Sequence, residues 1–91
     1  MDLEVPYNNL SSKEEVYEKI KKEVPPMLEK FQVKADLEYL NDEIKASGKG
    51  FDLSLKTLDD RCAIDMKLSF LLKPLKGKIL DSLERNLKKH I

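Results

Sequence analysis

Residues 62–91 read CAIDMKLSFLLKPLKGKILDSLERNLKKHI, and the spacing of their apolar side chains changes once. Apolar residues occupy every second position from Cys62 to Phe70, which predicts a strand with one buried face. Pro74 suits the first turn of a helix, and the apolar residues from there on recur at spacings of one, three and four. These residues are Leu75, Ile79, Leu80, Leu83, Leu87 and Ile91. The stretch therefore predicts a strand that stops before Pro74 and an amphipathic helix that continues to residue 91.

The segment before this stretch also alternates, starting at Val33. Asn41-Asp42 is typical of a hairpin turn, so the strand that starts at Val33 should end at Tyr39, just before this turn. The buried phase then changes within residues 47–50, whose two glycines suit a β-bulge. We therefore expect a strand from Val33 to Tyr39 and one long bent strand over residues 43–57.

The N-terminal third of the chain combines a short strand with a helix. Alternation over residues 2–7 predicts the strand. Ser11-Ser12 and Glu14-Glu15 then form two overlapping capping boxes, which mark the start of a helix. Pro25-Pro26 removes two amide donors, so we expect a kink or a break near Val24. The apolar stripe of this helix consists of Val16, Ile20, Val24, Met27, Leu28 and Phe31.

The order strand, helix, strand, strand, strand, helix predicts an α+β fold (β-α-β-β-β-α). The simplest arrangement is an antiparallel sheet of about four strands with two helices packed on one face. A chain of 91 residues supports one hydrophobic core. We therefore expect a single domain over residues 1–91.

The composition argues against several classes of protein. The chain carries 17 basic and 17 acidic residues, so it lacks the strong positive charge that favours nucleic-acid binding. Its longest mainly apolar run, Leu68–Leu72, is far shorter than the roughly 18 to 20 residues of a membrane-spanning helix. Met1–Glu4 has none of the features of a signal peptide. We expect a cytoplasmic protein with no transmembrane insertion and no nucleic-acid partner.

Charge is unevenly distributed along the chain. Residues 1–45 carry 7 basic and 11 acidic side chains, whereas residues 46–91 carry 10 and 6. Two explanations remain open: the halves attract each other, within one molecule or between copies, or the C-terminal half meets an anionic partner.

The sequence predicts no catalytic residues, no metal site and no cofactor. The chain has one cysteine and one histidine, which excludes an internal disulfide and the usual four-ligand zinc site. Cys62 lies on the buried phase of its strand, and His90 is expected to be solvated near the end of the chain. Asp42-Glu43 and Asp59-Asp60 fall at predicted turns, where aspartate bonds to the local backbone.

The C-terminal helix carries the candidate surface-binding residues. A basic amphipathic helix can dock on an anionic surface, although the alternative is that its apolar stripe covers the sheet and its basic residues are simply solvated. The candidates are Lys73, Lys76, Lys78, Arg85, Lys88 and Lys89.

A small hydrophobic ligand could instead lie between the sheet and the proline-containing helix. The candidate pocket residues are Met27, Phe31, Phe51 and Met66. The alternative is that these side chains fill the core, because a chain this short can spare little volume.

Three segments resemble the polyhydroxyalkanoic acid system proteins, also called granule-region proteins. The segments are LEVPYNNLS (residues 3–11), SGKGF (47–51) and, most specifically, LSFLLKPLKGKI (68–79). Tyr7-Asn8 stands near the point where many members carry a histidine. The resemblance implies a small bacterial protein tied to polyhydroxyalkanoate storage granules, and it implies no reaction or catalytic residue.

We therefore expect a non-enzymatic protein that binds the granule surface or its protein coat. The alternatives are a homodimeric assembly module, formed through an edge strand or the complementary halves, and the hydrophobic-ligand carrier. With both helices on one face, the other face of the sheet should be polar. Its expected outward residues are Asp52, Ser54, Lys56, Asp65, Lys67 and Ser69.

Overall fold

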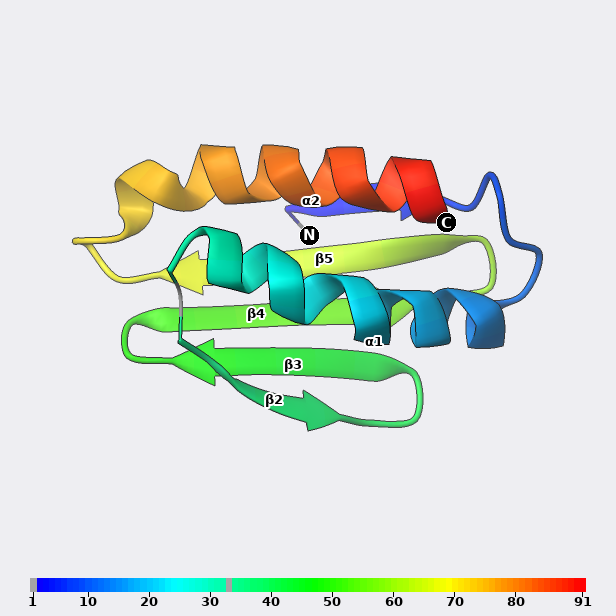
Figure 1. Ribbon diagram of the computed structural model, residues 1–91, viewed down its shortest axis with the longest axis horizontal. Coiled ribbons are helices and arrows are strands. Elements are labelled where there is room, and N and C mark those ends of the chain that lie inside the picture. Colours follow the sequence, from blue (N-terminus) through cyan, green and yellow to red (C-terminus); the bar gives the residue numbers. More distant parts are fainter. Residues whose placement is uncertain (1, 33) are drawn as a thin grey trace.

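A five-stranded antiparallel sheet, in the order β1-β5-β4-β3-β2, carries both helices on one face (Figure 1). The computed structural model describes residues 2–32 and 34–91, so the predicted strand start at Val33 lies outside the described residues. The elements are β1 (Leu3–Pro6), α1 (Lys13–Lys30), β2 (Asp36–Tyr39), β3 (Glu43–Gly48), β4 (Phe51–Thr57), β5 (Arg61–Leu68), the 3-10 turn η1 (Lys73–Leu75) and α2 (Lys76–His90). The predicted α+β fold, with both helices on one side, is confirmed.

The single long strand predicted for residues 43–57 was wrong, because this segment is a hairpin. β3 and β4 are joined by the two-residue loop Lys49-Gly50, and Gly48 pairs with Phe51. The two residues that flank a two-residue loop pair with each other, so their side chains lie on the same face of the sheet. Here one flanking residue has an even number (48) and the other an odd number (51). The change of phase in the sequence is therefore a reversal of the chain rather than a bulge.

The two glycines at this hairpin serve different needs. Gly50 has φ 76°, in the left-handed region that glycine enters at least cost. A Cβ on Gly48 would lie 2.3 Å from the carbonyl oxygen of Lys34, so glycine lets the chain entering β2 pass close to β3.

Helix α1 is not broken at Pro25-Pro26. Ser12 is its N-cap, and the Ser12 hydroxyl accepts a hydrogen bond from the Glu15 amide (3.2 Å). The helix buries five of the six predicted apolar residues, on both sides of the prolines, which holds the two parts in one element. The sixth, Phe31, is the C-cap and is partly exposed. The prolines have no N–H groups to donate to the carbonyls of Lys21 and Lys22. Both lysines are exposed, so water can donate to these carbonyls instead.

Strand β5 ends at Leu68, although the alternation of apolar residues continues to Phe70. Phe70 was expected on the buried face of this strand, but it lies outside the strand and is exposed. The Ser69 carbonyl accepts hydrogen bonds from the amides of Leu72 and Lys73, which starts the turn into η1. The prediction for Phe70 failed because the chain turns before the alternation of its apolar residues ends.

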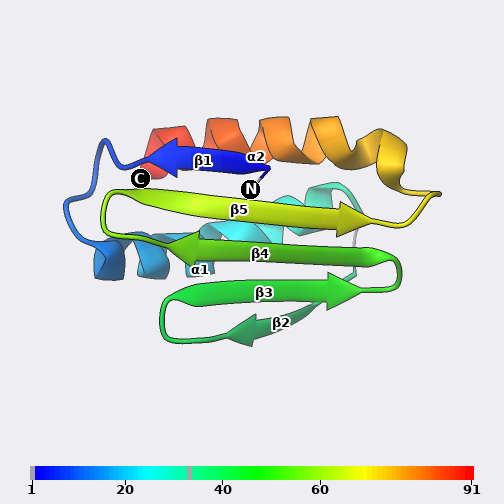
Figure 2. The same cartoon turned by 180° about the vertical axis from the view of Figure 1, so that it is seen from behind.

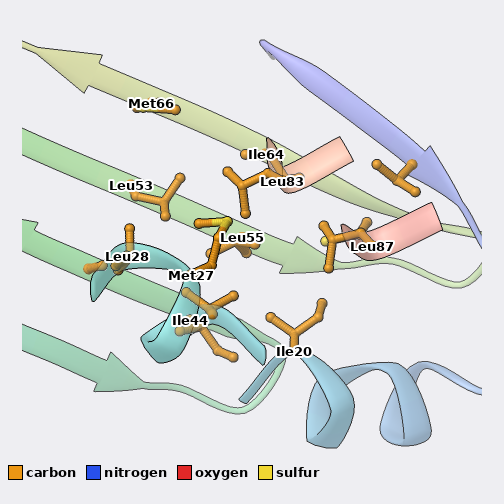
Figure 3. Close-up of a cluster of buried hydrophobic side chains, with 14 of the residues drawn as sticks. Ile20, Met27, Leu28, Ile44, Leu53, Leu55, Ile64, Met66, Leu83 and Leu87 are labelled. Atoms are coloured by element: carbon orange, nitrogen blue, oxygen red, sulfur yellow. The ribbon is translucent and has the colours of Figure 1, made fainter. Parts of the chain in front are cut away.

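The core lies between the sheet and the two helices. Helix α1 packs against β4, and α2 packs against β1 and α1. Figure 3 shows side chains of α1 and α2 meeting side chains of β3, β4 and β5. Those labelled there are Ile20, Met27, Leu28, Ile44, Leu53, Leu55, Ile64, Met66, Leu83 and Leu87.

Ile91, the C-cap of α2, is tied to the loop that follows β1. The Ile91 side chain is buried, and its carbonyl oxygen accepts from the amides of Asn8 (2.7 Å), Asn9 (2.9 Å) and Leu10 (3.1 Å). The Asn9 side chain donates to the carbonyls of Lys88 (3.3 Å) and Lys89 (3.1 Å), which satisfies groups that a helix end leaves free. We call residues 7–10 and 88–91 the closed end.

Candidate surface-binding site

Three of the six candidate basic residues are paired with carboxylates. The pairs are Lys76 with Asp2 (3.2 Å), Arg85 with Asp81 (3.1 Å) and Lys88 with Glu84 (3.4 Å). Among the described contacts, Lys73, Lys78 and Lys89 form no ion pair, and all three are exposed. Two of these three lie near the start of α2, so the uncompensated positive charge is concentrated there.

Asp2 holds the start of α2 against the sheet. Its carboxylate accepts a hydrogen bond from the Met66 amide of β5 (2.8 Å) and pairs with Lys76. The bond from the Met66 amide, and then the Lys76 ammonium, hold the pKa of Asp2 below its usual value. Asp2 thus bridges the two segments that flank residues 69–72.

Residues 69–72 form a turn at one end of the molecule, which we call the tip. Phe70 is 87% exposed and Leu71 is 86% exposed, the highest values among the large hydrophobic side chains described. Sequence reasoning missed this feature, although the three consecutive apolar residues Phe70, Leu71 and Leu72 already break the alternation of β5.

The face of the sheet without helices is turned to the viewer in Figure 2. It carries the predicted polar residues Asp52, Ser54, Lys56, Asp65 and Lys67, whereas Ser69 lies outside β5, in the tip. A shallow hollow of about 600 Å³ lies on this face. Its polar lining side chains are Asp36, Glu38, Lys45, Ser47, Asp52, Ser54, Asp65 and Lys67. Glu38 lies opposite Lys45, and Asp52 lies opposite Lys67 in the strand register, so opposite charges face each other. This partial charge compensation makes the face a weaker candidate for an anionic surface than the start of α2.

The four candidate pocket residues lie in or against the core. Met27, Phe51 and Met66 are buried in the core, and Phe31 packs against it while partly exposed. The hollow described above lies on the opposite face of the sheet. This placement favours the filled-core alternative over a ligand pocket.

Cys62 and His90, the two candidate reactive groups, have different surroundings. Burial raises the pKa of the Cys62 thiol to about 12, so the thiol is protonated at neutral pH. His90 is less exposed than expected, and its Nε2 lies 3.9 Å from a carboxylate oxygen of Glu23 on α1. Within residues 2–32 and 34–91, no group of His, Cys, Asp and Glu side chains could hold a metal ion. No helix in the same part of the chain is long and apolar enough to span a membrane.

The family model described as "Putative polyhydroxyalkanoic acid system protein" matches residues 9–91. The chain belongs to this family. The match includes the tip, η1 and all of α2, where the exposed lysines lie. No curated protein and no solved structure matches the chain. Membership in this family connects the protein with the polyhydroxyalkanoic acid system.

Proposed function

We propose that the protein is a non-enzymatic, cytoplasmic protein that binds the surface of polyhydroxyalkanoate storage granules. The family supplies the setting, and one feature of this chain carries the proposal. Residues 66–80 contain four lysines and no acidic residue. This segment includes the exposed Lys73 and Lys78, so it can approach an anionic surface without repulsion from carboxylates of its own.

Co-sedimentation with isolated granules tests this proposal. We expect the protein to bind granules stripped of their proteins, and raising the salt concentration should weaken that binding because salt screens exposed charges. Lys73→Glu combined with Lys78→Glu should weaken binding about tenfold or more, since each lysine near an anionic surface contributes about 1 kcal/mol.

The matched control reverses two exposed lysines of α1, Lys22→Glu and Lys30→Glu, which lie outside the basic segment. This control should bind nearly as well as the native protein. Salt-resistant binding to intact granules alone would indicate a protein of the granule coat as the partner. Absence of binding to any granule would contradict the proposal.

Homodimer assembly through the exposed edge strand β2 is a second hypothesis, which the composition of that strand disfavours. This strand has only four residues, three of them exposed, and Asp36 and Glu38 point away from the helices. Short, charged edge strands are typical of edges that resist pairing. Measurement of the molar mass in solution separates the two hypotheses.

A further inference from the structure

The tip projects beyond both the sheet and the helices. In Figures 1 and 2 the connection between β5 and η1 reaches the extreme end of the molecule, opposite the closed end. Phe70 and Leu71, the two most exposed large hydrophobic residues described, lie at its apex. Exposed apolar side chains gathered at one point mark interaction sites.

Hydrogen bonds hold the tip in this shape. The Ser69 amide donates to the Gly50 carbonyl (2.8 Å), and the Ser69 carbonyl accepts from Leu72 (3.0 Å) and Lys73 (2.9 Å). Leu72 packs against the core on the far side of the turn. Both ends of the turn are therefore anchored, so Phe70 and Leu71 are held in water by the fold itself.

The surroundings of the tip are basic. Lys67 and Lys73 flank it along the chain, and Lys49 lies in the β3–β4 loop, next to the Gly50 that bonds to Ser69. Lys78 follows in the first turn of α2. Asp52 lies opposite Lys67 and Asp2 pairs with Lys76, which leaves Lys49, Lys73 and Lys78 without an ion pair among the described contacts.

We propose that the tip inserts Phe70 and Leu71 into an anionic phospholipid layer while the surrounding lysines contact its headgroups. Two apolar side chains are too few for a stable protein interface, which buries about 800 Å² on each partner, but they suffice for shallow insertion between lipids. The lysines favour phospholipid over a bare polyester, because a polyester chain is neutral except at its ends. This inference rests on the proposed function at one point only, which is that the phospholipid layer lies at the granule surface.

A single tryptophan tests the insertion directly. The chain contains no tryptophan, so Phe70→Trp places one reporter at the apex. We expect its fluorescence to shift to the blue with vesicles of mixed phosphatidylcholine and phosphatidylglycerol. Leu40→Trp, an exposed site in the turn after β2 at the opposite end, should show no shift. An unshifted Phe70→Trp spectrum would overturn the proposal.

Vesicle affinity supplies the second measurement. Phe70→Ser with Leu71→Ser should weaken binding to the mixed vesicles at least tenfold, because burial of two large apolar side chains is lost. Leu40→Ser should bind like the native protein, and urea titration should give all three proteins similar stability. Undiminished binding by the double variant would overturn the proposal, as would native self-association that the double variant abolishes.

The two proposals can fail separately. Native protein that binds vesicles through the tip but binds no granules contradicts the granule function and leaves the tip inference standing. If the native protein and the double variant bind granules equally well and neither binds vesicles, the tip inference fails and the granule function stands.

Discussion

The two ends of the molecule use apolar residues in opposite ways. At the closed end, the Ile91 side chain is buried and its carbonyl oxygen accepts three amide hydrogen bonds. At the tip, Phe70 and Leu71 lie in the middle of the chain and are almost fully exposed. A residue in an apolar run is commonly buried, yet Phe70 and Leu71 are not, whereas Ile91, which follows three polar residues, is buried. Burial and hydrogen bonding, rather than position in the sequence, therefore separate residues that stabilise the fold from residues available for binding.

Ile91→Ala and Leu71→Ala give the strongest test of this difference. We expect Ile91→Ala to lower the free energy of unfolding by about 3 kcal/mol, because it leaves a cavity at the closed end. Leu71→Ala should change it by less than about 0.5 kcal/mol. Urea denaturation measures both, and equal losses of stability would show that the tip side chains are packed in solution.

Gly50→Ala tests whether the base of the tip is rigid. A Cβ on Gly50 would lie 2.7 Å from Ser69 Oγ, and the residue has a positive φ. We expect a loss of about 1–2 kcal/mol in the free energy of unfolding.

Gly77→Ala is the matched control, because its Cβ would meet nothing within 4 Å. It lies inside α2, where alanine should add about 0.5–1 kcal/mol of stability. The same small effect for both variants would contradict a rigid base.

The third expected loss of stability, smaller than those of Ile91→Ala and Gly50→Ala, concerns Asp2, which bridges the two segments flanking the tip. Its pKa is lowered from 3.8 in the folded state, so its stabilising contribution is present above pH 3.8 and disappears as the pH falls through that lowered value. Asp2→Asn should lower the free energy of unfolding by about 1 kcal/mol at pH 7.

This difference between Asp2→Asn and the native protein should shrink at acidic pH. Thermal unfolding at several pH values provides the measurement, with the exposed Asp59→Asn as the control. A constant difference across this range would show that the carboxylate charge does not hold the segment.

Much of the fold could be predicted from the periodicity of apolar residues. The alternation around Ile64 and the helical spacing from Ile79 to Leu87 mark buried faces correctly. The β3–β4 hairpin was missed because a change of phase fits a bulge and a two-residue loop equally well. Length could have separated these readings, since a strand of fifteen residues would greatly exceed the usual length of about five or six.

Less of the candidate site could be predicted. The lysines of α2 were identified from composition, but their partners were not, because Asp2 and Lys76 meet only after the chain folds. Phe70 was assigned to the core, since periodicity cannot show where a backbone hydrogen bond such as that from Leu72 to Ser69 ends a strand.

The pairing of β1 with β5 also determines the order in which the protein can assemble. Hairpins β2–β3, β3–β4 and β4–β5 join neighbours in the sequence and can form from local contacts. Leu3 instead pairs with Ile64, and Asn8 bonds to Ile91, so the first strand finds its place only when almost the whole chain is available. Closing such long loops costs conformational entropy before the contacts between their ends can stabilise the chain. Strand β1 is therefore made before β5 but can join the sheet only after β5 is made.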